Sequence, residues 1–316
     1  MAQNQPTARR GTYRDVIGLL RQPGLLESLR MHYAYVCTNY NNAHFTREAV
    51  RTLNAGRHPP AHIIVVDNKS EPKDVALLKA LALEHPNVEL VLNQDNIGYF
   101  PGLNSGIDRM RVLDPAVTTM VVGNNDLEFP ADFGECLAEV VASCPECPVI
   151  SPYVETLDGM PQNPHVVSGI SRKREVVYDL YYANYHLAKL IRAVARRTQK
   201  ITDRKDEEGH DTAQYIYQGH GSCYVLTPAF FRDFERLWAP TFMMGEEFFL
   251  SRQLSERGLM TYYDPRIRIR HHCNGAIENV PARKMWRLAR DAHRVYRRYI
   301  KPWHRQDYRH TSRSGE

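Results

Sequence analysis

The residues best suited to chemistry follow one short apolar run in the middle of the chain. Residues 120–122 read Met-Val-Val, and Asn124, Asn125, Asp126 and Glu128 follow them closely. A short β-branched run that ends in polar residues is typical of a buried strand whose carboxyl end meets a ligand at the edge of an α/β sheet. There, Asp126 suits a hard divalent cation and, through it, a phosphate group. The alternative is a strand that ends in an ordinary Asn/Asp turn.

Other strands are expected to deliver polar residues to the same edge. Strand-like and helix-like segments alternate over the first half of the chain, which predicts a parallel sheet with helices on both faces. The expected strands cover residues 32–37, 61–67 and 88–92 and the stretch 118–128, and the expected helices cover residues 45–53, 72–83 and 102–112. The polar residues Asn39, Asp67, Asn96 and Asp126 should therefore line one edge of the sheet.

Two common phosphate-binding classes are disfavoured by the segment after the first strand. This segment reads Thr-Asn-Tyr-Asn at residues 38–41, so neither the G-x-G-x-x-G pattern of dinucleotide folds nor a P-loop is present there. Asp67, at the end of the second strand, instead suits a nucleoside, because a carboxylate accepts hydrogen bonds from ribose hydroxyls or base N–H groups. The alternative for Asp67 is an N-cap or Asx turn before the next helix.

Composition fits one large α/β domain or two small ones. The chain has 316 residues, 43% of them apolar, and a net charge of +5. Its N-terminus is polar and no apolar run approaches ~18 residues, so we expect neither a signal peptide nor a spanning helix, and a cytoplasmic protein. The single C-x-x-C motif, Cys144 to Cys147, has no second pair; zinc or redox use is the alternative to the reduced thiols that we expect there.

Four motifs in the first half resemble family 2 glycosyltransferases of the GT-A fold, especially their rhamnosyltransferase-like branch. In order they are the T-N-Y-N segment, V-V-D-N-K-S at Val65–Ser70, N-x-x-N-I-G-x-x-x-G-x-N-x-G-I at Asn93–Ile107, and G-N-N-D at Gly123–Asp126. The last stands in the place of the family's D-x-D metal motif. The chain departs from it at Asn124, which replaces the first Asp.

The second half continues the resemblance, which covers about residues 32 to 300. The segments Leu157–Gln162, Gly219–Pro228, Phe242–Gly258 and Ile267–His272 resemble the family's turn before the acceptor region, the strand that closes the donor site, the E-D motif with its helix, and the strand that ends in a metal-binding His. In the E-D motif the usual Asp is Glu247 here.

The resemblance implies transfer of a sugar from a nucleotide-diphosphate donor with inversion at the anomeric carbon. Asp126 and His271 would then hold Mn²⁺ or Mg²⁺ against the diphosphate, and the imidazole favours Mn²⁺. His272 is the alternative ligand, because neighbouring residues of a strand point to opposite faces. The same resemblance implies a donor site, for which the candidates are Thr38, Asn39, Asn41, Asp67, Asn96, Gly98, Asn104, Asn125 and His220. His220 is equally consistent with a structural histidine.

An inverting transfer needs a general base, for which Glu247 is the first candidate and Glu246 the second. Both stand between Met-Met-Gly and Phe-Phe-Leu, an apolar setting that would raise one carboxyl pKa toward neutrality. The alternative is a pair of acidic first-turn residues favoured by the helix dipole.

Two further helices are expected in the second half. Residues 175–198 have apolar residues at helical spacing, and residues 201–212 form a charged loop. Residues 282–300 form a helix rich in Arg that also carries Trp286 and Tyr296, and residues 282–316 hold 11 Lys/Arg against 3 Asp/Glu. This basic aromatic helix is typical of a membrane-surface segment. The alternative is a helix that covers the core with a solvated basic face.

We therefore expect an α/β protein of the GT-A type, with a mixed sheet flanked by helices. Its parts are a peripheral segment 1–30 with a short helix near 13–29, a domain 31–280 with donor half 31–150 and acceptor half 151–280, and a basic helix and tail 281–316. The acceptor would be a glycan or lipid-linked saccharide in cell-surface polysaccharide synthesis, with no nucleic-acid partner. The alternative is a nucleotide-sugar-binding or scaffolding protein with impaired catalysis, which the departures at Asn124 and Glu247 suggest.

Overall fold

The computed structural model describes residues 31–167, 170–198, 209–273 and 282–300. The chain divides into two units after Met31, and the sheet and helices belong to the unit His32–Glu316. The expected helix near 13–29 and most of the charged loop 201–212 lie outside the described residues.

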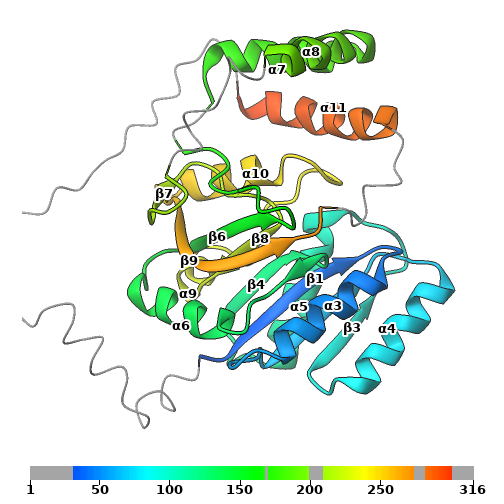
Figure 1. Cartoon of the computed structure of the whole chain (residues 1–316), viewed down its shortest axis with the longest axis vertical. Coiled ribbons are helices and arrows are strands. Elements are labelled where there is room, and N and C mark those ends of the chain that lie inside the picture. The colour runs from blue at the N-terminus through cyan, green and yellow to red at the C-terminus, as the bar shows by residue number, and fades with distance from the viewer. Residues whose placement is uncertain (1–30, 168–169, 199–208, 274–281, 301–316) are drawn as a thin grey trace, which may run out of the picture. The chain divides into compact units, whose positions relative to one another are not determined.

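Within the described residues, nine strands form one mixed sheet in the order β3-β2-β1-β4-β8-β6-β9-β5, and β7 pairs with β9 (Figure 1). The strands are β1 (Tyr33–Asn39), β2 (His62–Asp67), β3 (Val88–Leu92), β4 (Thr119–Asn124), β5 (Leu127–Glu128), β6 (Val149–Thr156), β7 (Gln214–Ile216), β8 (Cys223–Leu226) and β9 (Thr261–His271). The mixed sheet expected from the sequence is confirmed.

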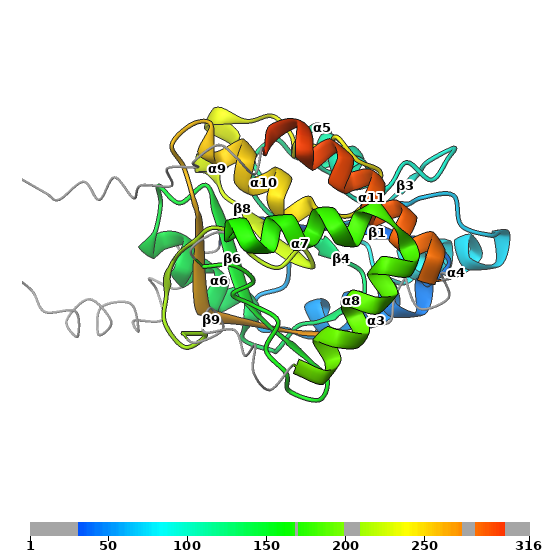
Figure 2. The same ribbon diagram turned by 90° about the horizontal axis from the view of Figure 1, so that it is seen from above.

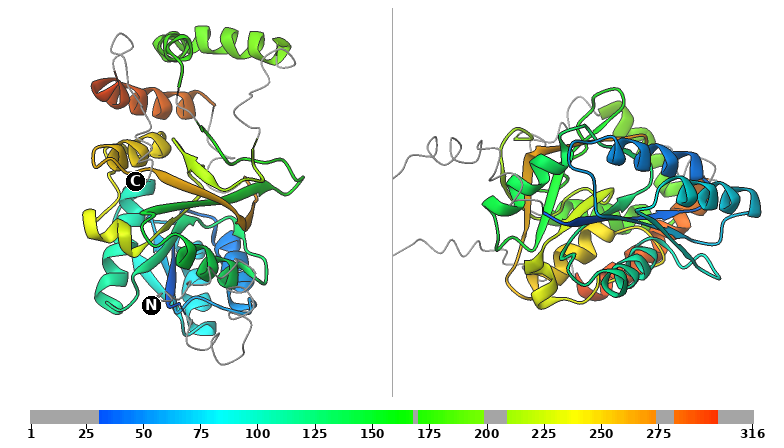
Figure 3. Two further views of the ribbon diagram at one scale, coloured as in Figure 1. Left: turned by 90° about the vertical axis from the view of Figure 1, so that its left-hand side faces the viewer. Right: turned by 90° about the horizontal axis from the view of Figure 1, so that it is seen from below.

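The helices complete the order of elements along the chain. They are α3 (Ala43–Asn54), α4 (Pro72–Glu84), α5 (Tyr99–Leu113), α6 (Phe133–Ser143), α7 (Arg172–Ala183), α8 (Tyr185–Thr198), α9 (Pro228–Asp233), α10 (Glu246–Ser255) and α11 (Ala282–Tyr299). Helices α3 and α4 cover one face of the parallel part of the sheet, and α5 covers the other (Figure 3).

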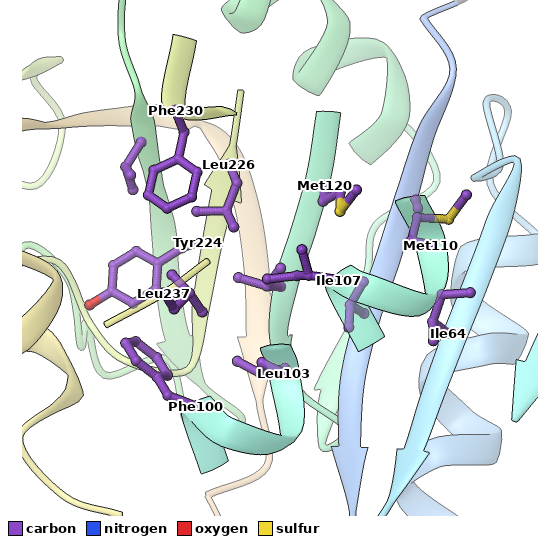
Figure 4. Close-up of a cluster of buried hydrophobic side chains, with 14 of the residues drawn as sticks. Ile64, Phe100, Leu103, Ile107, Met110, Met120, Tyr224, Leu226, Phe230 and Leu237 are labelled. Carbon is purple, nitrogen blue, oxygen red and sulfur yellow. The ribbon is translucent and has the colours of Figure 1, made fainter. Parts of the chain in front are cut away.

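The parallel part of the sheet comes from the first half of the chain. Strand β1 lies between β2 and β4 with all three parallel, and β3 extends the sheet beyond β2. These strands are nearly all apolar because both of their faces are buried. Side chains of β1, β2 and β4 on one face pack with α5 and with residues near β8 in the main hydrophobic core (Figure 4).

Helix α5 packs closely on the sheet because of Gly106. A Cβ atom at Gly106 would lie 2.3 Å from Cγ1 of Val36 and 2.9 Å from Cγ2 of Val66, much closer than a van der Waals contact. The missing side chain lets the helix backbone approach β1 and β2, which fixes the start of α5 beside the carboxyl ends of the strands.

The segment 175–198, expected as one helix, is two helices, so this prediction is wrong. Asn184 between α7 and α8 has extended backbone angles, φ −149° and ψ 138°. Its Oδ1 accepts the backbone N–H of His186 at 2.7 Å, which provides a side-chain partner for the first turn of α8. Viewed from above, α7 and α8 meet at a clear angle (Figure 2).

Helix α11 is confirmed, and it packs between α7 and α10. The indole Nε1 of Trp286 donates to the carbonyl of Tyr181 at 3.1 Å, and the ring of Tyr296 lies edge-on to Phe248 with centroids 4.2 Å apart. These two aromatic side chains of the expected membrane-surface segment are thus used in packing. The arrangement agrees with the alternative interpretation, a helix that covers the core, while Arg283, Lys284, Arg287, Arg294 and Arg298 remain exposed.

The expectation of reduced thiols at the C-x-x-C motif is wrong for this structure. Cys144 and Cys147 follow the last residue of α6 and are joined by a disulfide. The turn brings their Cα atoms to 5.4 Å, and the backbone N–H of Cys147 donates to the carbonyl of Cys144. Cys37, Cys136, Cys223 and Cys273 are free thiols.

Candidate active site

The ends of β1 and β2 are joined by a buried hydrogen-bond network. Asn39 Nδ2 donates to Asp67 Oδ1 at 2.9 Å and to Asp74 Oδ2 at 2.8 Å. The other carboxylate oxygen of Asp67 accepts the backbone N–H of Ser70 at 2.9 Å. Asp67 therefore forms the Asx-type turn that the sequence left as its alternative, while it also lies at the strand edge predicted for a nucleoside.

Asn125 extends this network to the end of β4. Its Nδ2 lies 2.7 Å from Thr46 Oγ1, 2.9 Å from Asn42 Oδ1 and 3.2 Å from Asn39 Oδ1. The amide side chains are buried and bond to one another, so they fix the relative positions of three strand ends. Asn42 and Asp74 were not among the site residues predicted from sequence. The only sequence signal for them is that each lies near the start of a helix, where Asn and Asp are common.

The other predicted donor residues are held by their own local contacts. Asn41 Oδ1 accepts the backbone N–H of Glu71 at 2.7 Å, and Asn96 Oδ1 accepts that of Gly98 at 3.1 Å. Gly98 has φ +98°, and a Cβ atom there would lie 1.9 Å from the carbonyl oxygen of Phe242. The close approach that Gly98 permits is thus to the loop before α10.

Thr38 packs against the first turns of α5, and Asn104 is a residue of that helix. The position a Cβ would take on Gly102 is 2.8 Å from Cγ2 of Thr38. Asn104 donates to the carbonyl of Leu237 at 2.8 Å and accepts its N–H at 2.9 Å. The side-chain amide of Asn104 is therefore already hydrogen-bonded to the backbone of a loop. A contact of Asn104 with the nucleotide-sugar donor stays a prediction.

Asp126 and His271 come together from opposite halves of the chain. Strand β5 runs antiparallel to the end of β9, with Leu127 opposite His271. The Nε2 atom of His271 lies 3.2 Å from Oδ1 of Asp126, and both side chains are buried. A carboxylate oxygen and an imidazole nitrogen thus face each other at the edge where a metal was predicted.

Two amide side chains orient the imidazole of His271. Its Nδ1 lies 2.8 Å from Gln162 Oε1, an acceptor, which puts the ring proton on Nδ1. Its Nε2 lies 3.2 Å from Asn124 Nδ2, a donor. The lone pair on Nε2 therefore points toward Asp126 and Asn124, the orientation that a metal ligand needs.

His272 faces a different carboxylate. Its Nε2 lies 2.8 Å from Glu128 Oε1, and its ring packs against Phe45 with centroids 5.3 Å apart. At the end of β9, His271 thus lies beside Asp126, and the next residue, His272, lies beside Glu128. Of the two histidines, His271 is the one whose geometry fits the predicted metal site.

The donor set fits a divalent ion that takes most of its ligands from a substrate. No group of three or more His, Cys, Asp and Glu side chains able to hold a metal exists in the part of the chain that the structure describes. Asp126 and His271 would supply two ligands, an oxygen and a nitrogen, and diphosphate oxygens and water would supply the others. The ion would neutralise charge on a leaving diphosphate.

Glu246 and Glu247 begin α10 and have different surroundings. Glu246 is buried, and its Oε1 accepts the N–H of Met244 at 2.8 Å. Burial, and then the charge of Glu247, raise the pKa of Glu246 to about 8. Glu247 Oε1 accepts the N–H of Gly221 at 3.2 Å, and its side chain lines a cavity between α7, α10 and α11. Glu246 therefore supports the helix start, whereas Glu247 faces open space.

Gly221 lies in a backbone segment that reaches from Glu247 to the residues beside Asp126. The next residue, Ser222, accepts the N–H of Asn124 at 2.8 Å through its carbonyl. His220 lies beside the same segment, with its ring 5.7 Å from that of His271 and its Nδ1 2.8 Å from Ser222 Oγ. Burial, with a smaller effect of His271, lowers the pKa of His220 to about 3, so this imidazole is neutral at ordinary pH.

Comparison with known families gives one match in sequence. Residues 36–172 match Glycosyl transferase family 2, which is less than half of the chain. The matched range includes Asp67 and Asp126 and ends before Glu247 and His271. A search of curated proteins finds no match.

Three solved structures are similar to this chain at low sequence identity. GalNAc-T7 with UDP, GalNAc and Mn²⁺ is 13% identical, with a TM-score of 0.49 over 76% of this chain and 44% of its own. The mannosyltransferase PcManGT from Pyrobaculum calidifontis with GDP-Man and Mn²⁺ is 16% identical and has a TM-score of 0.48. The match covers 84% of this chain and 62% of PcManGT. TarS residues 1–349 from S. aureus in complex with UDP are 10% identical and have a TM-score of 0.46. The match covers 74% of this chain and 60% of the TarS chain. The chain thus spans between 44% and 62% of the length of these relatives.

The raised pKa of Glu246 predicts a pH-dependent stability. Its carboxyl ionises near pH 4.5 in the unfolded chain and near pH 8 in the folded one. The unfolded state therefore releases this proton first, and the contribution of Glu246 to the free energy of unfolding falls between about pH 4.5 and 8 and is constant above. Relative to Glu246→Gln, the wild type should be most stable at pH 5 and lose that advantage by pH 8, as measured by urea denaturation.

The control for this prediction is Glu256→Gln, which changes a carboxylate with half of its side chain exposed one residue past the end of α10. It should leave the pH dependence of the wild type unchanged. A stability difference between the wild type and Glu246→Gln that is the same at pH 5 and pH 8 would contradict the burial argument.

Proposed function

We propose that the protein is an inverting glycosyltransferase. It would move a sugar from a UDP- or dTDP-linked donor to a glycan or lipid-linked saccharide, in cell-surface polysaccharide synthesis. The proposal rests chiefly on the 3.2 Å approach of His271 to Asp126. Asp126 lies inside the Glycosyl transferase family 2 match and His271 lies far outside it, and in our proposal both would bind the same metal ion.

The donor would lie along the carboxyl ends of β1, β2 and β4. Asp67 is the candidate acceptor for a ribose hydroxyl or base N–H, as its carboxylate lies at the end of β2. The Asp126–His271 pair would hold the diphosphate through Mn²⁺ or Mg²⁺. Rhamnose, the sugar of the branch that the motifs resemble, is among the donor sugars to be tested.

The transfer itself needs a general base beside the hydroxyl group of the acceptor saccharide. The acceptor hydroxyl would give its proton to Glu247 as its oxygen forms a bond to the anomeric carbon. The bond from that carbon to the diphosphate breaks on the opposite side, and the diphosphate leaves with the bonding electrons. Glu247 suits this role better than Glu246 because its carboxylate lines a cavity, whereas Glu246 is occupied at the helix start.

Replacing Glu247 by Gln should remove the base and keep the shape of the site. We expect transfer to fall by about 10²–10⁴-fold, the typical cost of losing a general base. Binding of the nucleotide sugar, measured by thermal shift, should stay as in the wild type. Glu256→Gln serves again as the matched control and should keep full activity.

Two results would oppose this assignment. A Glu247→Gln variant with unchanged turnover would exclude Glu247 as the base. A wild type that binds nucleotide sugars but transfers to no saccharide in a broad panel would favour the alternative of a binding or scaffolding protein.

The proposal includes contact with an anionic membrane surface, where a lipid-linked acceptor would be found. No helix among the described residues is both long enough and apolar enough to span a bilayer. Helix α8 offers a surface instead. Leu190 is 61% exposed, and Leu187 and Ile191 are partly exposed. The described side chains of α8 include the basic residues Lys189, Arg192 and Arg197 and no acidic residue.

This combination of exposed apolar side chains and positive charge suits lipid head groups better than water or a neutral partner. Each Lys or Arg near an anionic surface contributes about 1 kcal/mol. Helices α7 and α8 form the layer outside α11 (Figure 1), and this position supports assigning to α8 the membrane contact that we expected of the C-terminal helix.

Vesicle sedimentation tests this part of the proposal. The purified chain should sediment with vesicles that contain anionic phospholipid and much less with neutral phosphatidylcholine vesicles. Leu190→Glu should reduce binding several-fold, and Leu83→Glu, which changes an 87% exposed leucine on α4, should not. Equal binding by both variants, or concentration-dependent dimers of the wild type in place of vesicle binding, would exclude α8 as a membrane surface.

A further inference from the structure

A cavity of about 250 Å³ lies between α7, α10 and α11. Its walls carry the aromatic side chains of Tyr178, Tyr182, Phe248 and Tyr296, and the carboxylate of Glu247. The volume is slightly below the ~300–1,000 Å³ typical of drug-sized pockets, so it suits a ligand of about one ring.

Gln218 adds a polar group that has no partner in the protein. It is 4% exposed and lines the cavity. Its backbone exchanges two hydrogen bonds with Val166, at 2.9 and 3.0 Å. Its side-chain Nε2, in contrast, has no hydrogen-bond partner among the described residues. Native proteins rarely leave a buried amide donor unsatisfied, which points to a ligand atom that accepts this N–H.

The aromatic walls match one face of a sugar ring. Phe248 and Tyr296 meet edge to face with centroids 4.2 Å apart, and Tyr182 lies 4.6 Å from the ring of His293. Aromatic rings supply rigid apolar contact area, which the C–H face of a pyranose can cover. A carboxylate and an amide on the same walls can then bind its hydroxyl groups.

The walls are fixed by ion pairs between α7 and α11. Arg297 Nη1 lies 2.7 Å from Glu175 Oε2, and Arg297 Nε lies 2.5 Å from Asp179 Oδ1. His293 Nε2 approaches the same Asp179 oxygen at 2.8 Å. These contacts connect α7 and α11, the two helices that supply Tyr178, Tyr182 and Tyr296 to the walls of the cavity.

We propose that this cavity binds the ring of the acceptor saccharide that receives the transferred sugar, with Gln218 Nε2 donating to one of its oxygens. This inference rests on the proposed function, because it gives Glu247 a hydroxyl group to deprotonate. The sugar would lie against Tyr178, Tyr182 and Tyr296, with the reacting hydroxyl toward Glu247 and the donor site.

The test uses p-nitrophenyl hexopyranosides, including rhamnosides, as acceptor probes with the full chain. Binding is measured directly by saturation-transfer NMR, which does not depend on turnover. Gln218→Leu keeps the side-chain size and removes the unpartnered N–H, so it should fold at least as stably as the wild type. It should weaken glycoside binding tenfold or more and leave nucleotide-sugar binding unchanged.

Gln214→Leu is the matched control, since Gln214 lies on β7 and bonds the carbonyl of Gly209 outside the cavity. It should bind glycosides as the wild type does. Glycosides that bind the wild type and Gln218→Leu equally, or bind neither, would overturn the cavity assignment. Hydrolysis of the nucleotide sugar in the absence of an acceptor tests the proposed function separately. If the wild type hydrolyses the nucleotide sugar and Gln218→Leu still binds glycosides as the wild type does, the cavity assignment fails and the proposed function stands.

Discussion

The site depends on one short antiparallel strand pairing, that of β5 with the end of β9. It places Leu127 opposite His271, and so brings the imidazole to Asp126, the residue before β5. The pairing is held from the other side as well, because β9 runs parallel to β6 along most of its length. Without it, the imidazole of His271 would not reach the carboxylate of Asp126, and the two halves of the chain would not share a site.

The donor half of the fold could be predicted from sequence because its strands are buried on both faces. Continuous apolar runs at β1, β2 and β4, each followed by Asn or Asp, indicate parallel strands with a polar edge, and the structure has them in nearly the predicted positions. The pairing of His271 with Asp126 was predictable only through the order of family motifs, since no local pattern relates residues so far apart. The motif order favoured His271 and left His272 as the alternative ligand, and the register of β5 with β9 places His271 beside Asp126.

The helical layer was harder to predict. The apolar stripe on residues 175–198 was interpreted as one long helix, but Asn184 interrupts the helix, and Val177 and Leu180 of the stripe are exposed. Local propensity did not reveal this, because Asn is tolerated in helices and here serves as a cap. Similarly, the sequence pattern of aromatic and basic residues in α11 is the same for a helix that faces lipid and for one that packs on α10. The sequence provided no reason to select Gln218, because only the folded structure shows that its buried side-chain Nε2 has no hydrogen-bond partner among the described residues.

The central claim is that Asp126 and His271 bind a divalent ion that neutralises a nucleotide diphosphate. The most direct measurement is a thermal-shift titration of UDP, dTDP and GDP sugars with and without Mn²⁺, on the wild type and on His271→Ala. We predict that one nucleotide stabilises the wild type only when Mn²⁺ is present, by about 2.7 kcal/mol at 100 times its Kd, and that His271→Ala loses most of this effect. A nucleotide shift that is the same without metal, or unchanged in His271→Ala, would contradict the account.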